Sequence, residues 1–120
     1  MNDSTCTIEN LKNEMRTFIK ERKWESYHNP KNISMSIAIE AAELMELFQW
    51  IDKEDIKELT QDSKKMTDIE DEVADVFCYL MSFVSSLDID LTEAVLRKIV
   101  KNRKKYPTSI FQGNYEKVKL

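Results

Sequence analysis

Apolar residues recur three and four positions apart in four stretches of the sequence, which is the spacing of one face of an α-helix. These stretches cover about residues 8–24, 34–50, 66–87 and 90–106. The chain contains one glycine and two prolines, too few for the tight turns on which strand-rich folds depend. The sequence therefore predicts an all-α fold, a bundle of four to five helices.

Local signals suggest where these helices begin. The candidate N-caps are Thr5 or Thr7 for the first helix, Asn32 or Ser34 for the second and Asp90 for the fourth. Asp90 stands three residues before a glutamate, which is the spacing of a capping box. Asn29-Pro30 is predicted to break the chain after the first helix. The charged segment 52–63 is expected to hold a short amphipathic helix around Ile56 and Leu59.

Length and charge narrow the class of protein. A chain of 120 residues suits one domain, so we expect residues 1–120 to form a single domain with its core over about residues 8–107. The net charge of −4 argues against nucleic-acid binding, which usually needs a basic surface. No apolar run approaches the ~20 residues of a membrane span, and the polar N-terminus does not resemble a signal peptide. We expect a cytoplasmic protein without nucleic-acid or membrane partners.

Two carboxylates interrupt the apolar surface of the second predicted helix. In IEAAELMELFQW, Glu40 and Glu43 are three residues apart. On a helical wheel Glu40 falls between Leu44 and Leu47, and Glu43 lies on the far side of Leu47, near Trp50. A lone ionised carboxylate is costly to bury. Several converging carboxylates can stay ionised if they share a cation, so the pair predicts a metal site.

The third predicted helix supplies a second pair of acids. In IEDEVADVFCYL, Glu72 and Asp75 have the same spacing, beside an apolar face. Helices packed along these faces would bring four carboxylates together, and this oxygen-only ligand set suits Mg²⁺ or Mn²⁺ better than zinc. The competing interpretation is that each pair is a solvated surface, where such spacing is common. A di-iron bundle is disfavoured because it needs two Glu-x-x-His motifs, whereas the only histidine is His28, in a predicted loop.

Together, EAAELMELFQW and EDEVADVFCYL resemble the ExxE and ExxD signature of the MazG-like all-α nucleoside triphosphate pyrophosphohydrolases. FIKERKWESYHNPKN, DIDL and KIVKNRKKYP also look like the dCTP pyrophosphatase branch of that family. The resemblance covers about residues 11–107. It implies that Glu40, Glu43, Glu72 and Asp75 hold Mg²⁺ and that a water attacks between the α- and β-phosphates, which leaves a nucleoside monophosphate and pyrophosphate.

The same resemblance implies a set of phosphate-binding residues on the fourth predicted helix. Lys98 and Asn102 lie on one stripe of this helix, and they are expected to reach the triphosphate, with Tyr106 closing the motif. Spacing alone would favour another interpretation, a solvated helix end where cations complement the helix dipole.

A cage around the base is the second substrate-binding feature that the resemblance implies. Its expected members are Trp24, His28, Asn32 and Trp50, with Tyr79 beside the sugar. The competing interpretation is that these aromatic residues only pack at helix ends, where amphipathic rings are common.

The second predicted helix is apolar around most of its circumference, and the third is nearly as broad. Four or five helices cannot cover both, so we expect a homo-oligomer, and the resemblance favours a tetramer, a dimer of dimers, over a dimer. The expected function is hydrolysis of a (deoxy)nucleoside triphosphate, dCTP or a similar nucleotide, in nucleotide-pool house-cleaning. The alternatives are a related hydrolase of dUTP or noncanonical triphosphates and a non-catalytic helical oligomerisation or regulatory module.

Overall fold

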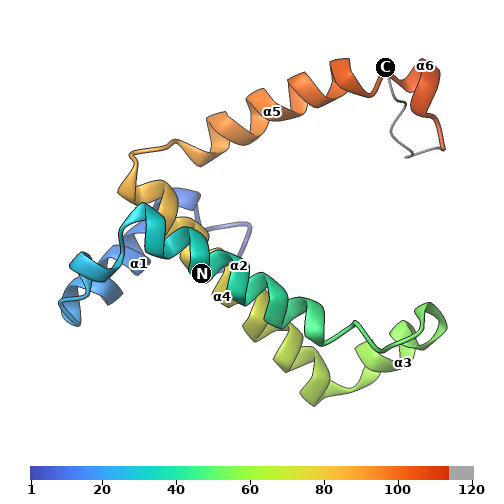
Figure 1. Cartoon of the computed structure of the whole chain (residues 1–120), viewed down its shortest axis with the longest axis horizontal. Helices are drawn as coiled ribbons and strands as arrows, with labels where there is room; N and C mark the ends of the chain where they lie inside the picture. The colour runs from blue at the N-terminus through green and yellow to red at the C-terminus, as the bar shows by residue number, and fades with distance from the viewer. Residues whose placement is uncertain (114–120) are drawn as a thin grey trace. The chain divides into compact units, whose positions relative to one another are not determined.

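The computed structural model describes residues 1–113, and every regular element within that range is helical (Figure 1). This confirms the all-α prediction. In chain order the elements, with η for a 3₁₀ helix, are α1 (Ile8–Glu21), η1 (Glu25–Tyr27), α2 (Pro30–Glu46), η2 (Lys53–Asp55), α3 (Ile56–Gln61), α4 (Ser63–Ser86), α5 (Leu91–Lys105) and α6 (Thr108–Phe111). The sequence predicted all of the α-helices except α6, and residues 114–120 of the expected tail lie outside the described range.

The chain forms two compact units, Met1–Asp88 and a second unit that begins at Ile89. The expectation of one domain over residues 1–120 stays a prediction. In the first unit, α2 and α4 run antiparallel, side by side, and make the most extensive helix–helix contact (Figure 1). α1 and α3 also pack on α4, which is therefore the central helix of this unit.

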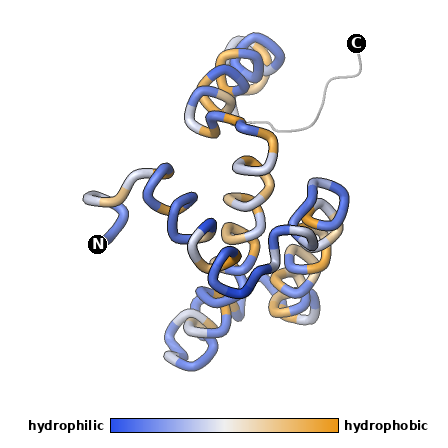
Figure 2. Tube along the Cα trace, turned by 90° about the vertical axis from the view of Figure 1, so that its left-hand side faces the viewer, coloured by the Kyte–Doolittle hydropathy of each residue, from blue (hydrophilic) through white to orange (hydrophobic). Residues whose placement is uncertain are grey.

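The helices are amphipathic, with hydrophobic and hydrophilic residues alternating along each tube (Figure 2). The buried apolar side chains among the described residues are Ile19 of α1, Ile33 of α2, Leu59 of α3, and Met81 and Val84 of α4. Within residues 1–113, none of the helices combines the length and the apolar character that a membrane crossing needs.

The start of α2 differs from the prediction. Asn29 is the N-cap, and its Oδ1 accepts a hydrogen bond from the backbone N–H of Asn32 at 3.0 Å. Neither Asn32 nor Ser34 is the cap, so that prediction was wrong. Pro30 stands in the first turn, where its missing N–H costs no helical hydrogen bond and its fixed φ suits a helix. The Asn-Pro pair therefore begins a helix as well as ending the preceding segment.

Two other caps were predicted correctly. Thr7 accepts from the Asn10 backbone N–H at 3.1 Å, and the Asn10 side chain accepts from the Thr7 N–H at 2.9 Å, so they form a capping box. The carboxylate of Asp90 accepts from the Glu93 N–H at 2.9 Å. These contacts satisfy N–H groups that the first turn of a helix leaves without partners.

Replacing the α2 cap should destabilise the protein. We expect Asn29→Ala to lower the free energy of unfolding by about 1 kcal/mol, because it removes the side-chain acceptor. Ser34→Ala is the matched control, since its hydroxyl donates to the Lys31 carbonyl on the exposed helix surface. Denaturant unfolding of both variants at one protein concentration measures the difference. Equal losses would show that Asn29 is not the cap.

Candidate active site

Glu40 and Glu43 of α2 converge with Glu72 of α4. Carboxylate oxygens from the three residues all lie within 4.8 Å of one another. Oε2 of Glu40 and Oε2 of Glu72 are buried and have no hydrogen-bond partner among the described residues. Buried polar atoms nearly always have a partner, so two such oxygens in a cluster of acids have the character of metal ligands.

Burial and the charges of neighbouring acids disfavour the ionised forms of Glu40 and Glu72. Burial is the largest of the causes that raise the pKa of Glu40 from its ordinary value of 4.5 to about 7. A hydrogen bond that protonated Glu40 donates to Glu43, and the charges of Glu43, Asp75 and Glu72, act in the same direction. The pKa of Glu72 is also raised, first by burial and then by the charges of Glu43 and Asp75. Asp75 is thus close enough to act on both of these acids. A divalent cation would reverse the effect because it favours the ionised carboxylates.

The donor set of this cluster is made of carboxylate oxygens alone. Hard cations such as Mg²⁺ and Mn²⁺ prefer oxygen ligands, whereas zinc is usually held by nitrogen and sulfur. The unpaired buried oxygens and the raised pKa values both fit a cation of this class. Of the four acids that the sequence pairs, Glu40 and Glu43 of α2 and Glu72 of α4 form the converging group, whereas Asp75 is not part of it.

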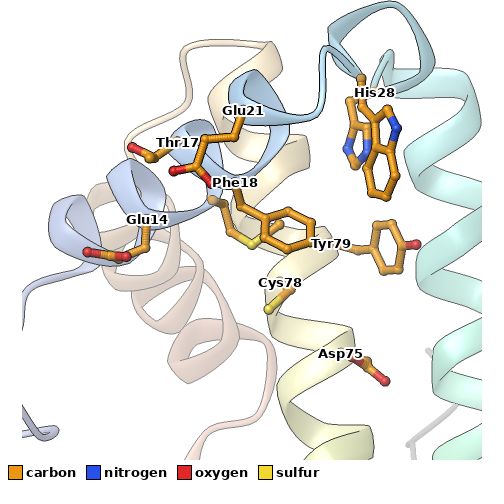
Figure 3. A pocket seen from close by; sticks show the side chains of 10 residues that line it. Glu14, Thr17, Phe18, Glu21, His28, Asp75, Cys78 and Tyr79 are labelled. Atoms are coloured by element: carbon orange, nitrogen blue, oxygen red, sulfur yellow. The ribbon is translucent and has the colours of Figure 1, made fainter.

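A cavity of about 600 Å³ adjoins the acids and is bordered by α1, η1 and α4. Among the residues that line it are Phe18, Trp24, His28, Asp75 and Tyr79. Figure 3 shows Asp75 and Tyr79 extending from the same side of α4, and His28 lies above Tyr79 in this view. Because Asp75 both lines the cavity and acts on the other acids, the cavity opens beside the acidic cluster.

Ring contacts order the aromatic wall of this cavity. Phe18 and Trp24 meet edge to face with their centroids 5.9 Å apart, and the Arg22 guanidinium lies 3.8 Å from the Phe18 ring centroid. The His28 ring is nearly parallel to Tyr79, 6.2 Å between centroids. Its Nδ1 lies 3.0 Å from the hydroxyl of Ser82 on α4. The wall is therefore held by contacts among its own members.

The sequence interpretation missed two of these residues. Phe18 fits the helical period of α1 and reads as a core position, yet it is half exposed and faces the cavity. Ser82 is a buried hydroxyl in an otherwise apolar stretch of α4. A polar residue at such a position was the available signal, because buried hydroxyls usually have a partner.

Two expected members of the base cage do not line this cavity. Trp50 follows the end of α2 and is 87% exposed, whereas the sequence had placed it inside the helix. Asn32 donates a side-chain hydrogen bond to the carbonyl of Tyr27 at 3.3 Å. That contact ties the first turn of α2 to η1 and so supports the segment that carries His28.

The expected phosphate-binding residues belong to the second unit, on α5 and its C-terminal cap. The Tyr106 backbone N–H donates to the Asn102 carbonyl at 2.8 Å, and the Tyr106 ring meets Phe111 of α6 edge to face, 5.1 Å between centroids. Lys98 is exposed one turn before Asn102. Lys98 and Asn102 thus lie on one stripe of α5, and Tyr106 follows as the C-cap of the helix.

Comparison with known proteins gives consistent matches. The chain matches the MazG-like family over residues 35–119. It is 32% identical over 111 residues to dCTP pyrophosphatase 1 of Bos taurus, covering 92% of this chain and 66% of the relative. It is 31% identical over 111 residues to dCTP pyrophosphatase 1 of Homo sapiens, covering 92% and 65%. The chain thus spans just under two thirds of the length of these relatives.

A solved structure also matches. The crystal structure of a pyrophosphatase from Archaeoglobus fulgidus superposes with a TM-score of 0.78 and 39% sequence identity, over 89% of this chain and 98% of the other. The sequence match extends over most of the chain, every regular element among the described residues is helical, and acids converge from α2 and α4. This chain belongs to the MazG-like family.

Proposed function

We propose that this chain is a Mg²⁺-dependent nucleoside triphosphate pyrophosphohydrolase that converts dCTP, or a similar deoxynucleotide, to the monophosphate and pyrophosphate. The observation that carries the proposal is the convergence of carboxylates beside an aromatic-lined cavity. Relatives named dCTP pyrophosphatase 1, and a pyrophosphatase with a similar fold, support the reaction class. The enzyme would act in the cytoplasm, where it removes unwanted nucleotides before a polymerase uses them.

In this proposal Glu40, Glu43, Glu72 and Asp75 hold the cation. Bound Mg²⁺, or Mn²⁺ in its place, would offset phosphate charge and lower the pKa of a water. A carboxylate of the cluster accepts the proton of the attacking water as general base. Trp24 and His28 hold the base in the cavity, Tyr79 borders the sugar, and Asn32 supports the His28 segment through Tyr27. No covalent nucleophile is needed, because water itself attacks the phosphate.

The triphosphate would be recognised from α5. Lys98 and Asn102 supply a charged and a neutral hydrogen-bond donor on one stripe of the helix, and Tyr106 ends it. A charge-assisted contact from lysine to phosphate is stronger than a contact between neutral groups. These residues would therefore contribute to positioning the α- and β-phosphates for attack.

The functional form would be a homo-oligomer, for which we favour a tetramer over a dimer. Met35 and Ile39 of α2 and Val73 and Phe77 of α4 are between 43% and 58% exposed. Apolar side chains on both central helices are suited to burial against a second copy. Trp50, which is 87% exposed after the end of α2, stays a proposed member of the base cage.

The reaction is tested by pyrophosphate release from a panel of deoxynucleoside triphosphates. We expect hydrolysis that depends on Mg²⁺ and is fastest with dCTP. Glu43→Gln and Asp75→Asn should abolish it while leaving a folded protein, because each removes a charge and little volume. Glu46→Gln, on the exposed surface of α2, should keep wild-type turnover.

Each contrary result in this panel has a distinct meaning. Preference for dUTP or a noncanonical triphosphate would correct the substrate. Absence of turnover with every nucleotide would favour a non-catalytic oligomerisation or regulatory module. Near wild-type turnover of Glu43→Gln or Asp75→Asn would exclude the four-carboxylate site.

Metal-free stability should depend on pH through Glu40. The folded protein keeps the Glu40 proton up to a pKa of about 7, against 4.5 for an unperturbed carboxyl. Its stabilising contribution is full below pH 4.5 and is lost as the pH rises through about 7. Thermal unfolding in chelator between pH 4 and 8 should show this loss in the wild type and in Glu46→Gln. The loss should be smaller in Glu40→Gln and in saturating Mg²⁺, and an unchanged pH profile in Glu40→Gln would contradict the assignment.

Substitutions of basic residues on α5 test whether this helix recognises phosphate or is a solvated helix end. Lys98→Ala should lower kcat/KM at least about tenfold, equal to ~1.4 kcal/mol, because a charge-assisted phosphate contact is lost. Lys101→Ala is the matched control on another side of the helix, where an exposed charge usually contributes under ~1 kcal/mol. Initial rates at low and moderate salt distinguish the two variants. Equal, small effects would identify the helix end as solvated surface.

A further inference from the structure

Ser82 and His28 make a buried contact between segments 54 residues apart. Ser82 is 5% exposed on α4, and its Oγ lies 3.0 Å from Nδ1 of His28. We propose that Ser82 is a positioning residue that fixes His28 as the Nε2–H tautomer, so that the ring presents a donor to an acceptor atom of the base. The contact with the base rests on the proposed function, whereas the tautomer of His28 does not.

The direction of the hydrogen bond follows from the hydroxyl proton. A serine hydroxyl has one proton to donate, and burying that proton without an acceptor costs free energy. Among the described residues, His28 Nδ1 is the hydrogen-bond partner of the Ser82 side chain. If Nδ1 carried a proton and donated to Oγ, the serine proton would be buried without an acceptor. Ser82 therefore donates, and Nδ1 is the unprotonated nitrogen.

The opposite edge of the ring is then a donor. In a neutral imidazole one nitrogen carries the proton and the other accepts, so the His28 proton resides on Nε2. Nε2 has no hydrogen-bond partner among residues 1–113, and His28 lines the 600 Å³ cavity. A donor at this position fits a ring carbonyl or an unprotonated ring nitrogen, such as O2 or N3 of cytosine. It does not fit an exocyclic amino group.

Stacking restricts the ring further. The His28 and Tyr79 rings are inclined by 15°, and Ser82 lies one turn after Tyr79 on α4. Tyr79 thus fixes the plane of the imidazole, while Ser82 selects between the two ring orientations related by a half-turn about the Cβ–Cγ bond. Without the hydroxyl, rotation about the Cβ–Cγ bond could exchange the positions of nitrogen and carbon atoms and remove the donor from the cavity.

The tautomer can be measured in the nucleotide-free protein, because His28 is the only histidine. Long-range ¹H–¹⁵N spectra at a pH where the ring is neutral should place the proton on Nε2. The Nδ1 resonance should move in Ser82→Ala and stay in place in Ser82→Thr, which keeps the hydroxyl. Ser85→Ala is the matched control, since its buried Oγ has no partner among the described residues, and it should leave the ring unchanged. A proton on Nδ1, or an unmoved Nδ1 resonance in Ser82→Ala, overturns the proposal.

Binding tests whether Ser82 acts through His28. With the non-hydrolysable α,β-imido analogue of dCTP and Mg²⁺, calorimetry should show about fivefold weaker binding for Ser82→Ala, the scale of one hydrogen bond. The same substitution should change nothing in a His28→Ala background. Equal losses in both backgrounds would mean that Ser82 acts by packing and would overturn the positioning role. If the wild type binds no analogue, the proposed function and the base contact both fail, while the spectra decide the tautomer independently.

Discussion

Repulsion among carboxylates on two antiparallel helices is the constraint on which the rest of the structure depends. The pairing of α2 with α4 brings carboxylate oxygens of Glu40, Glu43 and Glu72 within 4.8 Å of one another, and burial together with the charges of neighbouring acids disfavours the ionisation of Glu40 and Glu72. Because the helices are antiparallel, Ile33 near the start of α2 and Met81 and Val84 near the end of α4 belong to the same end of the pair. Apolar packing is therefore concentrated beyond the acids, and the middle of the helix pair carries the charge.

Helical spacing made the acidic cluster predictable. A helix repeats every 3.6 residues, so the neighbours of Glu40 on its own surface follow from the local sequence. The same local argument failed at the ends of α2. Asn29-Pro30 can both end one segment and begin the next helix, and its second role was overlooked. The helix was predicted over residues 34–50, but it begins at Pro30 and ends at Glu46. Both predicted ends were therefore four residues too late, and Trp50 was assigned to the helix although it lies beyond its end.

Contacts between distant segments account for what the sequence could not predict. His28, which follows η1, contacts Ser82 of α4 although the two residues are 54 positions apart in the sequence. Helical periodicity relates only residues of the same helix, so it could not predict this contact. Phe18 has the spacing of a core residue but lies in the cavity wall, where Trp24 and Arg22 contact its ring. Apolar spacing predicts which side of a helix faces inward, yet a cavity wall and a packed core present the same pattern.

The two parts of the candidate site depend on different helices. The acids come from α2 and α4, whereas Phe18 and Trp24, which form the aromatic wall, belong to α1 and the segment after it. α1 contacts α4 over a smaller surface than α2 does. A substitution in α1 can therefore reshape the wall without displacing the carboxylates, so that in the proposed enzyme the base preference would vary while the proposed hydrolysis is retained. Asp75 and Tyr79 limit this independence, because α4 presents both to the same cavity and joins the acids to the aromatic wall (Figure 3).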